Sequence, residues 1–124
     1  MGIRILTLIK RKPGLTPEQF REGYENSHAK IAMELFGHLY AEYRRNYLGR
    51  AFSFADSSVT DGPDEIGFDA VSEVVLKDGV TMQDMAKIMD AHRERIVEDE
   101  KRWFHRKRSW VTTCDTVEVD LDNS

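Results

Sequence analysis

Residues 3–28 read IRILTLIKRKPGLTPEQFREGYENSH, and this stretch carries most of the signals that decide the fold. Ile3–Lys10 has apolar side chains on both faces of an extended chain, so it predicts a strand that is covered on both sides. The Lys12–Gly14 segment, with its Pro-Gly pair, predicts a turn. Thr16 then begins a T-x-x-Q capping box, which predicts the start of a helix immediately after the turn.

His28 is expected at the margin of the apolar face of this helix. At 100° per residue from Phe20, Tyr24 and Ile31 fall within about 60° of it and His28 falls near 80°. Histidine exchanges protons near neutral pH, so His28 is the best candidate for proton transfer, with Tyr24 one turn earlier as a hydrogen-bond donor. The alternative is a partly buried histidine that bonds to a backbone carbonyl.

The rest of the chain predicts three further strands and a second long helix. Residues 41–48, 68–76 and 109–121 have strand patterns, residues 49–67 read as one long loop, and a helix begins after Thr81. This order predicts a ferredoxin-like split βαβ sandwich, an α+β fold with a four-stranded antiparallel sheet. Its helices cover one sheet face, so the two-sided apolar first strand predicts a homodimer. We expect one domain over residues 1–121 and a disordered tail over 122–124.

The second helix and the third strand supply the other candidate site residues. Met82, Met85, Met89 and Ile96 share a helix face, a pattern typical of core that also suits a pocket for a flat apolar ligand. Asp69 and Glu73 share a strand face and are candidates to orient the His28 imidazole. The expected substrate-binding residues are His92, Met85, Met89, Trp103 and Tyr47.

Composition excludes several classes of function. A net charge of −4 argues against a general nucleic-acid binder. Residues 101–110 read KRWFHRKRSW and resemble a single-strand-binding surface, but their cations fall at the expected end of a helix, where the dipole favours them. No run reaches the roughly 18 apolar residues of a membrane span, and no signal peptide opens the chain, so we expect a cytoplasmic protein that binds no membrane.

Motifs for metals and cofactors are also missing from the sequence. Cys114 is the single cysteine, so there is neither an intrachain disulfide nor a thiolate metal cluster. The histidines have no HExxH-like spacing, and no Gly-rich phosphate loop is present. We therefore expect no metal and no cofactor.

Three segments resemble the EthD-domain family. Residues 11–29, RKPGLTPEQFREGYENSHA, resemble its first helix region, with a basic-Pro-Gly turn, a capped helix and a histidine followed by alanine. Residues 97–109, VEDEKRWFHRKRS, resemble its closing helix, and residues 68–78, FDAVSEVVLKD, resemble its third strand. The resemblance spans nearly the whole chain except residues 50–65.

The resemblance implies a dimeric α+β barrel and a family of varied chemistry. Some fungal relatives are similar to decarboxylases of aromatic polyketide acids, and more distant barrel relatives are cyclases or cofactor-free oxygenases. By position, His28 matches the helix-one histidine, Asp99 and Glu100 match an acidic pair, and Arg108 matches a terminal arginine. His105 stands where many members have an acidic residue.

Together these features predict a cofactor-independent lyase of the decarboxylase, dehydratase or cyclase type. Its expected substrate is an aromatic or polyketide-like phenolic small molecule, and its expected catalytic residues are His28, Tyr24, Asp69 and Glu73. Two alternatives stay open: a cofactor-free monooxygenase of phenolic substrates, and a non-catalytic binding or assembly protein on the same barrel.

Overall fold

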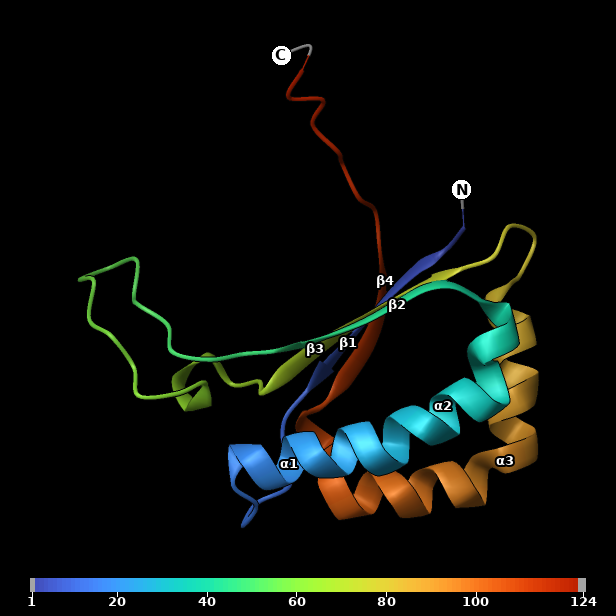
Figure 1. The fold of residues 1–124 in the computed structure, drawn as a ribbon, viewed down its shortest axis with the longest axis horizontal. Helices are drawn as coiled ribbons and strands as arrows, with labels where there is room; N and C mark the ends of the chain where they lie inside the picture. Colours follow the sequence, from blue (N-terminus) through green and yellow to red (C-terminus); the bar gives the residue numbers. More distant parts are fainter. Residues whose placement is uncertain (1, 123–124) are drawn as a thin grey trace.

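The computed structural model describes residues 2–122, which fold as an antiparallel sheet with helices on one side (Figure 1). The strands are β1 (Arg4–Ile9), β2 (Tyr40–Tyr47), β3 (Ala70–Leu76) and β4 (Trp110–Cys114). The α-helices are α1 (Pro17–Gly23), α2 (Ala29–Phe36) and α3 (Met82–Trp103). A π-helical turn, η1 (Tyr24–His28), joins α1 to α2, and short 3₁₀ turns follow as η2 (Gly37–Leu39), η3 (Asp64–Ile66) and η4 (Arg106–Arg108).

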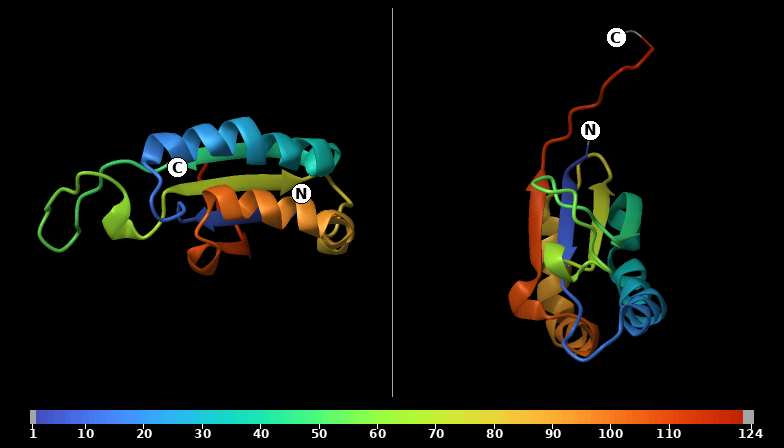
Figure 2. Two further views of the ribbon diagram at one scale, coloured as in Figure 1. Left: turned by 90° about the horizontal axis from the view of Figure 1, so that it is seen from below. Right: turned by 90° about the vertical axis from the view of Figure 1, so that its left-hand side faces the viewer.

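The sheet has four strands in the order β2-β3-β1-β4, and every neighbouring pair is antiparallel. This is the order of a ferredoxin-like split βαβ fold, so the fold predicted from the sequence is confirmed. Helices α1, α2 and α3 all lie on the same face of the sheet (Figure 2). The functional site must therefore be sought on that face or at its edges.

The two faces of the sheet differ in what covers them. Ile5 and its partner Val74 point toward the helices and are buried. Leu6 and Leu8 alternate with Ile5 and point the other way, where no element of the described chain covers them (Figure 2). The described chain thus covers only one of the two apolar sides of β1, whereas the sequence pattern predicts cover on both.

The helix after β1 begins as the sequence predicts but widens before its midpoint. Thr16 and Gln19 form a reciprocal capping box, with backbone N–H to side-chain oxygen distances of 2.9 and 3.1 Å. At η1 the Ala29 N–H bonds to the Tyr24 carbonyl, five residues back, so one residue more than an α-turn is accommodated there. The wheel drawn for an uninterrupted α-helix does not include this extra residue.

Helix α3 also begins at a capping box and departs from regular geometry once. Thr81 and Asp84 cap it reciprocally, and His92 has φ −124° and ψ 19°, which kinks the helix near its middle. At its last turn the Trp103 ring lies against Gly23 of α1, where an added Cβ would come within 2.1 Å of the ring. Glycine is needed at position 23 to let the two helices approach this closely.

The last strand is shorter than predicted. β4 ends at Cys114, which pairs with Arg4, the first residue of β1, so the partner strand ends where β4 does. Residues 115–122 continue away from the body with Val117 and Val119 exposed (Figure 1). The predicted strand to residue 121 is therefore wrong beyond residue 114. Of the tail predicted to be disordered, residues 123 and 124 lie outside the described residues.

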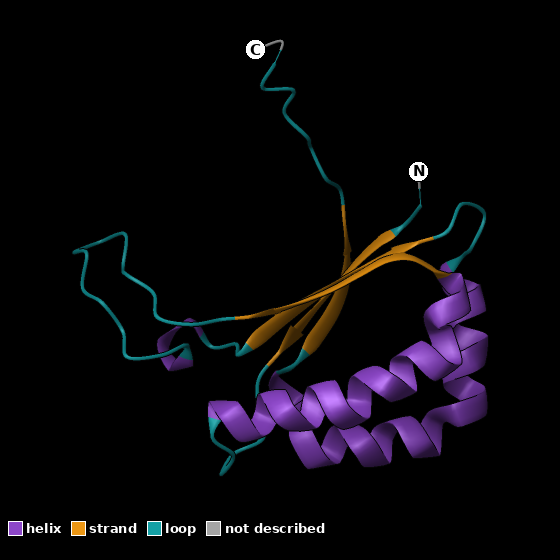
Figure 3. Ribbon diagram, in the orientation of Figure 1, coloured by secondary structure: helices purple, strands orange, loops and turns teal. Residues whose placement is uncertain are grey.

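The long loop projects from one end of the sheet but has defined internal contacts (Figure 3). The Thr60 N–H bonds to the Ala51 carbonyl at 2.8 Å, and Asp64 forms ion pairs with Lys10 and Arg11 after β1. The first contact joins two parts of the loop, and the ion pairs of Asp64 connect its later part to the end of β1. Among the described helices, none combines the length and apolar composition required to cross a bilayer.

Candidate active site

A cavity of about 720 Å³ lies between the helix-covered face of the sheet and the helices. Its wall is mostly apolar, with Ile5 and Ile9 from β1 and Phe104 after α3. The lining also contains polar and charged side chains, which can orient a small molecule bound against the apolar wall. These polar residues are Thr7, Tyr24, His28, Tyr40, Tyr43, Ser72, Asp90, Arg93, Glu100, Arg106, Lys107 and Ser109.

His28 lines this cavity and is held from behind by Asp99 of α3. The His28 Nδ1 atom lies 3.0 Å from Asp99 Oδ2, and only 14% of the histidine side chain is exposed. A carboxylate at this nitrogen accepts its proton in a hydrogen bond, which places the proton on Nδ1 and leaves Nε2 as the nitrogen that can act on a ligand. This arrangement is suited to general acid–base chemistry.

Asp99 is buried and receives further donors on its other oxygen. The Ser27 hydroxyl donates to Oδ1 at 2.6 Å, and the Trp103 indole N–H approaches the same atom at 3.4 Å. The π-turn η1 places Ser27 and His28, which are adjacent in the chain, on the two oxygens of one carboxylate. Asp99 is thereby restrained by three side chains, and it restrains the imidazole in turn.

Aromatic rings pack around the imidazole. The His28 ring lies edge-on to Phe104, with centroids 4.8 Å apart, and to Tyr24, with centroids 5.9 Å apart. Burial raises the pKa of Tyr24 well above its ordinary value, and neighbouring Tyr43 adds to the effect while Ser72 opposes it. Tyr24 therefore stays protonated at neutral pH and can serve as a hydrogen-bond donor.

Four of the residues predicted from the sequence come together at the cavity. His28 and Tyr24 line it from η1, and Met85 and Met89 line it from α3. Met82, which belongs to the same helix face, lies in the lining as well. The methionine face thus packs toward the space beside the imidazole, where a flexible apolar wall can adapt to a ligand.

The two acids predicted to orient His28 lie elsewhere. Asp69 is 3% exposed, accepts the Arg11 backbone N–H at 2.8 Å and forms ion pairs with Arg11 and Lys10. Glu73 is on the uncovered face of the sheet, ion-paired with Arg4. Neither acid contacts the imidazole, and Asp99 occupies the position that the sequence argument gave to them.

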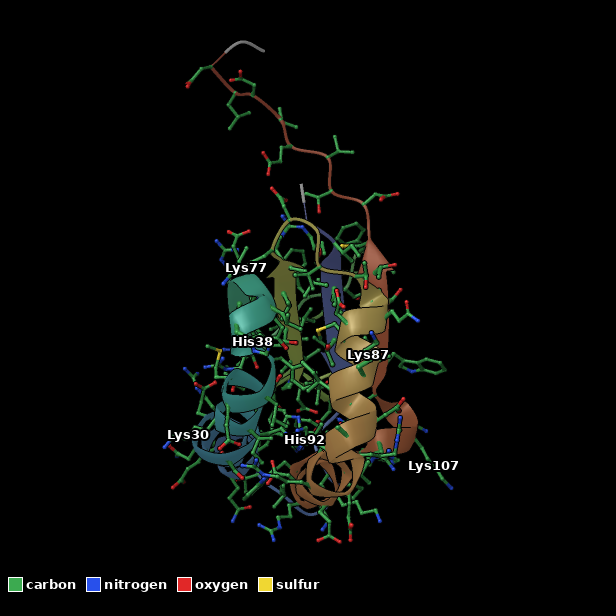
Figure 4. The ribbon with its side chains drawn as sticks, turned by 90° about the vertical axis from the view of Figure 1, so that its right-hand side faces the viewer. Lys30, His38, Lys77, Lys87, His92 and Lys107 are labelled. Atoms are coloured by element: carbon green, nitrogen blue, oxygen red, sulfur yellow. The ribbon has the colours of Figure 1, made fainter. Side chains whose placement is uncertain are left out.

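Three of the predicted substrate-binding residues are outside the cavity lining. His92 lines a separate groove between α3 and the η1–α2 segment. Figure 4 labels His92 on α3. Trp103 packs against the core and supports Asp99. Tyr47 donates to Glu25 and lies under the guanidinium of Arg21, 4.6 Å from the ring centroid.

Glu25 belongs to an ion pair at the edge of the helix layer. The Arg45 guanidinium donates to both of its oxygens, at 2.6 and 2.7 Å. These bonds, helped by the Tyr47 hydroxyl, lower the pKa of Glu25 to about 2. Burial and the bond to Glu25 raise the pKa of Tyr47. The pair fixes η1 to β2.

The remaining expectations from the sequence concern the role of His105 and the absence of a metal site. The His105 backbone N–H bonds to the Lys10 carbonyl at 2.7 Å, so this residue anchors the chain between α3 and β4 to the end of β1. Within residues 2–122 there is no group of three or more histidine, cysteine, aspartate or glutamate side chains placed to hold a metal ion.

Comparisons with known proteins identify the family. The chain is similar to an EthD-like protein from Ralstonia eutropha, with 12% identity, 98% of each chain covered and a TM-score of 0.61. It is also similar to a protein from Arabidopsis thaliana, with 16% identity, 96% of this chain and 99% of that chain covered, and a TM-score of 0.55. At these identities the likeness concerns the fold. No curated protein sequence matches the chain. The EthD domain matches residues 12–107, and the chain belongs to the EthD domain family.

Proposed function

We propose that the protein is a cofactor-independent lyase that acts on an aromatic or polyketide-like phenolic acid by histidine acid–base chemistry. The observation that carries this proposal is the His28–Asp99 pair at the wall of the apolar cavity. A buried carboxylate orients the imidazole toward the cavity, and an apolar cavity limits the access of water to a reactive intermediate.

Decarboxylation is the reaction of this class that the site fits most simply. In a β-keto acid, the bond between the carboxylate carbon and the adjacent carbon breaks, CO₂ leaves, and the electron pair passes to the β-carbonyl as an enolate. The imidazolium of His28 gives its Nε2 proton to the carbon that lost CO₂, and water returns a proton to His28. Tyr24 hydrogen-bonds to the substrate, and the apolar wall holds the ring.

Turnover assays with a panel of aromatic β-keto acids and ortho-phenolic acids test this role. His28→Ala is expected to lower CO₂ release by about 10²- to 10⁴-fold, the usual contribution of a general acid–base group. His38→Ala is the matched control because His38 is exposed and lies outside the cavity lining. Equal turnover by wild type and His28→Ala would refute the role. Oxygen uptake with a phenolic substrate would indicate the monooxygenase alternative instead.

We further propose that the working unit is a homodimer that packs the uncovered sheet faces together. Leu8 lies on that face between Val71 and Trp110, and Trp110 is 64% exposed. Covering this face removes apolar surface from water. Leu8→Glu is expected to shift the mass measured by light scattering from dimer to monomer, whereas Met33→Glu, on an exposed helix position, leaves the dimer intact. A dimer that persists in Leu8→Glu contradicts this interface.

A further inference from the structure

Three hydroxyl groups from three different elements meet on the sheet side of the cavity. Tyr24 comes from η1, Tyr43 from β2 and Ser72 from β3, and all three line the cavity. Tyr24 and Ser72 are 2% and 4% exposed. The registers Arg45↔Ser72 and Tyr43↔Val74 place the two strand residues two positions apart on the same helix-covered face. The sequence argument singled out only Tyr24 of this group.

The wall around these hydroxyls is apolar. Ile5 and Val74 flank them on the sheet, and Ile31 faces them from α2. An oxygen that leaves water for such surroundings needs a hydrogen-bond partner, because an unpaired buried polar group costs about 1–3 kcal/mol. Arg45 lies over the Tyr43 ring at 4.7 Å, but its charge is compensated by Glu25. The hydroxyls therefore offer uncharged hydrogen bonding in an apolar setting.

Tyr24 is in hydrogen-bonding contact with both Ser72 and Tyr43. Each hydroxyl carries one proton and also has lone pairs that accept. A group of three hydroxyls on the cavity wall can therefore hydrogen-bond to an oxygen atom in the cavity.

We propose that Tyr43, Ser72 and Tyr24 form a subsite for the phenolic or keto oxygen of an aromatic ligand. This inference rests on the proposed function and specifies its substrate: the ring must carry a neutral oxygen that enters the apolar end of the cavity. Ionic groups of the ligand belong at the exposed rim, where Arg93 and Arg106 lie. In the decarboxylation, the same hydroxyls hydrogen-bond to the oxygen that gains charge as the enolate forms.

Binding of 2-naphthol and of naphthalene, measured by fluorescence titration, tests the subsite without any turnover. Wild type is expected to prefer 2-naphthol by about 3- to 10-fold, the value of one hydrogen bond. Tyr43→Phe and Ser72→Ala are expected to abolish this preference. Tyr40→Phe is the matched control, because Tyr40 lines the same cavity, stacks on Phe36 and keeps its ring contact with Tyr43 in the variant.

Each outcome of the titration decides the question. Absence of any preference for 2-naphthol in wild type, or its persistence in both Tyr43→Phe and Ser72→Ala, overturns the subsite. Circular dichroism and thermal unfolding establish that each variant is folded before it is titrated. A protein that shows the preference but no lyase activity would refute the proposed reaction alone, and an active protein without the preference would refute the subsite alone.

Discussion

The Nδ1 atom of His28 and the Oδ2 atom of Asp99 are 3.0 Å apart although 71 positions separate the two residues in the chain. The contact joins the π-turn after α1 to the last third of α3, so two elements from opposite halves of the sequence build one acid–base pair. Because His28 lines the cavity, the hydrogen bond between these two residues is the first contact to test.

Asp99→Asn is expected to weaken the preference of His28 for carrying its proton on Nδ1, because a neutral amide is a weaker acceptor than a carboxylate. Long-range ¹H–¹⁵N NMR of the imidazole reads the tautomer directly. Turnover should fall by about 10²-fold. Ser27→Ala removes one donor to Asp99 and keeps the His28 contact, so its effect should stay below about tenfold. An unchanged tautomer in Asp99→Asn would contradict the assignment.

Deletion of Asn26 is expected to convert the π-turn into an α-turn. The Ala29 N–H would then bond to the Tyr24 carbonyl across four residues instead of five, so α1 and α2 keep their packing. Ser27 and His28 would then no longer both hydrogen-bond to Asp99. Activity should therefore be lost, while helical content and thermal stability are retained. The replacement Asn26→Ala, at an exposed position, is the control and should keep activity. Full activity of the deletion would show that the wide turn has no positioning role.

Gly23→Ala is expected to destabilise the protein by about 1–3 kcal/mol, because the new Cβ overlaps the Trp103 ring. Urea unfolding measures the loss. Gly49→Ala is the matched control, since no atom lies within 4 Å of a Cβ at that position. Movement of Trp103 should also disturb its contact with Asp99, so the His28 tautomer is a second readout. Equal stability of the two variants would show that α1 and α3 can separate freely.

Asp69→Asn is expected to lower stability and to leave the chemistry of the folded protein intact. Asp69 is buried against Arg11 and Lys10, and breaking such a pair costs about 3–5 kcal/mol. Thermal unfolding should therefore occur at a lower temperature, while kcat, measured well below that temperature, stays within about twofold of wild type. A large loss of kcat with unchanged stability would restore Asp69 as a catalytic residue.

Glu25→Gln is expected to remove a stabilising term that depends on pH. The pKa of Glu25 is lowered from 4.5 to about 2 by Arg45, so its contribution is complete above pH 4.5 and is lost as the pH falls toward 2. The difference in Tm between wild type and Glu25→Gln should be constant from neutral pH to about pH 5 and should shrink below it. High salt should reduce the difference because the pair is partly exposed. A difference that does not change with pH would contradict the ion pair.

Local patterns in the sequence were sufficient to predict the helices and strands and to identify His28 and Tyr24 as cavity residues. The capping box at Thr16, the helix start after Thr81 and the apolar run of β1 are short-range patterns, and the structure confirms each of them. His28 and Tyr24 were found because their helix phase is nearly right even with a wide turn between them. The extra residue in that turn leaves no compositional mark, so the π-turn could not be predicted.

The partners of His28 required tertiary information. Asp69 precedes β3 and Glu73 lies on its uncovered face; both faces of β3 contain apolar residues, and alternation alone cannot say which face the helices cover. Asp99 sits among other acids in a charged stretch of α3, where only the packing of α3 on η1 distinguishes it. The length of β4 likewise depends on where β1 begins, which its own alternation does not encode.

The position of Asp99 has a consequence for how protons are exchanged with water. His28 lines the cavity, whereas Asp99 and Ser27 line the separate groove between α3 and the η1–α2 segment. The histidine–carboxylate pair is thus the partition between two compartments. A ligand that fills the cavity excludes water from the Nε2 atom of His28. The Asp99 carboxylate on the other side of the imidazole still borders the groove. Substrate and solvent protons therefore approach the His28–Asp99 pair from different sides.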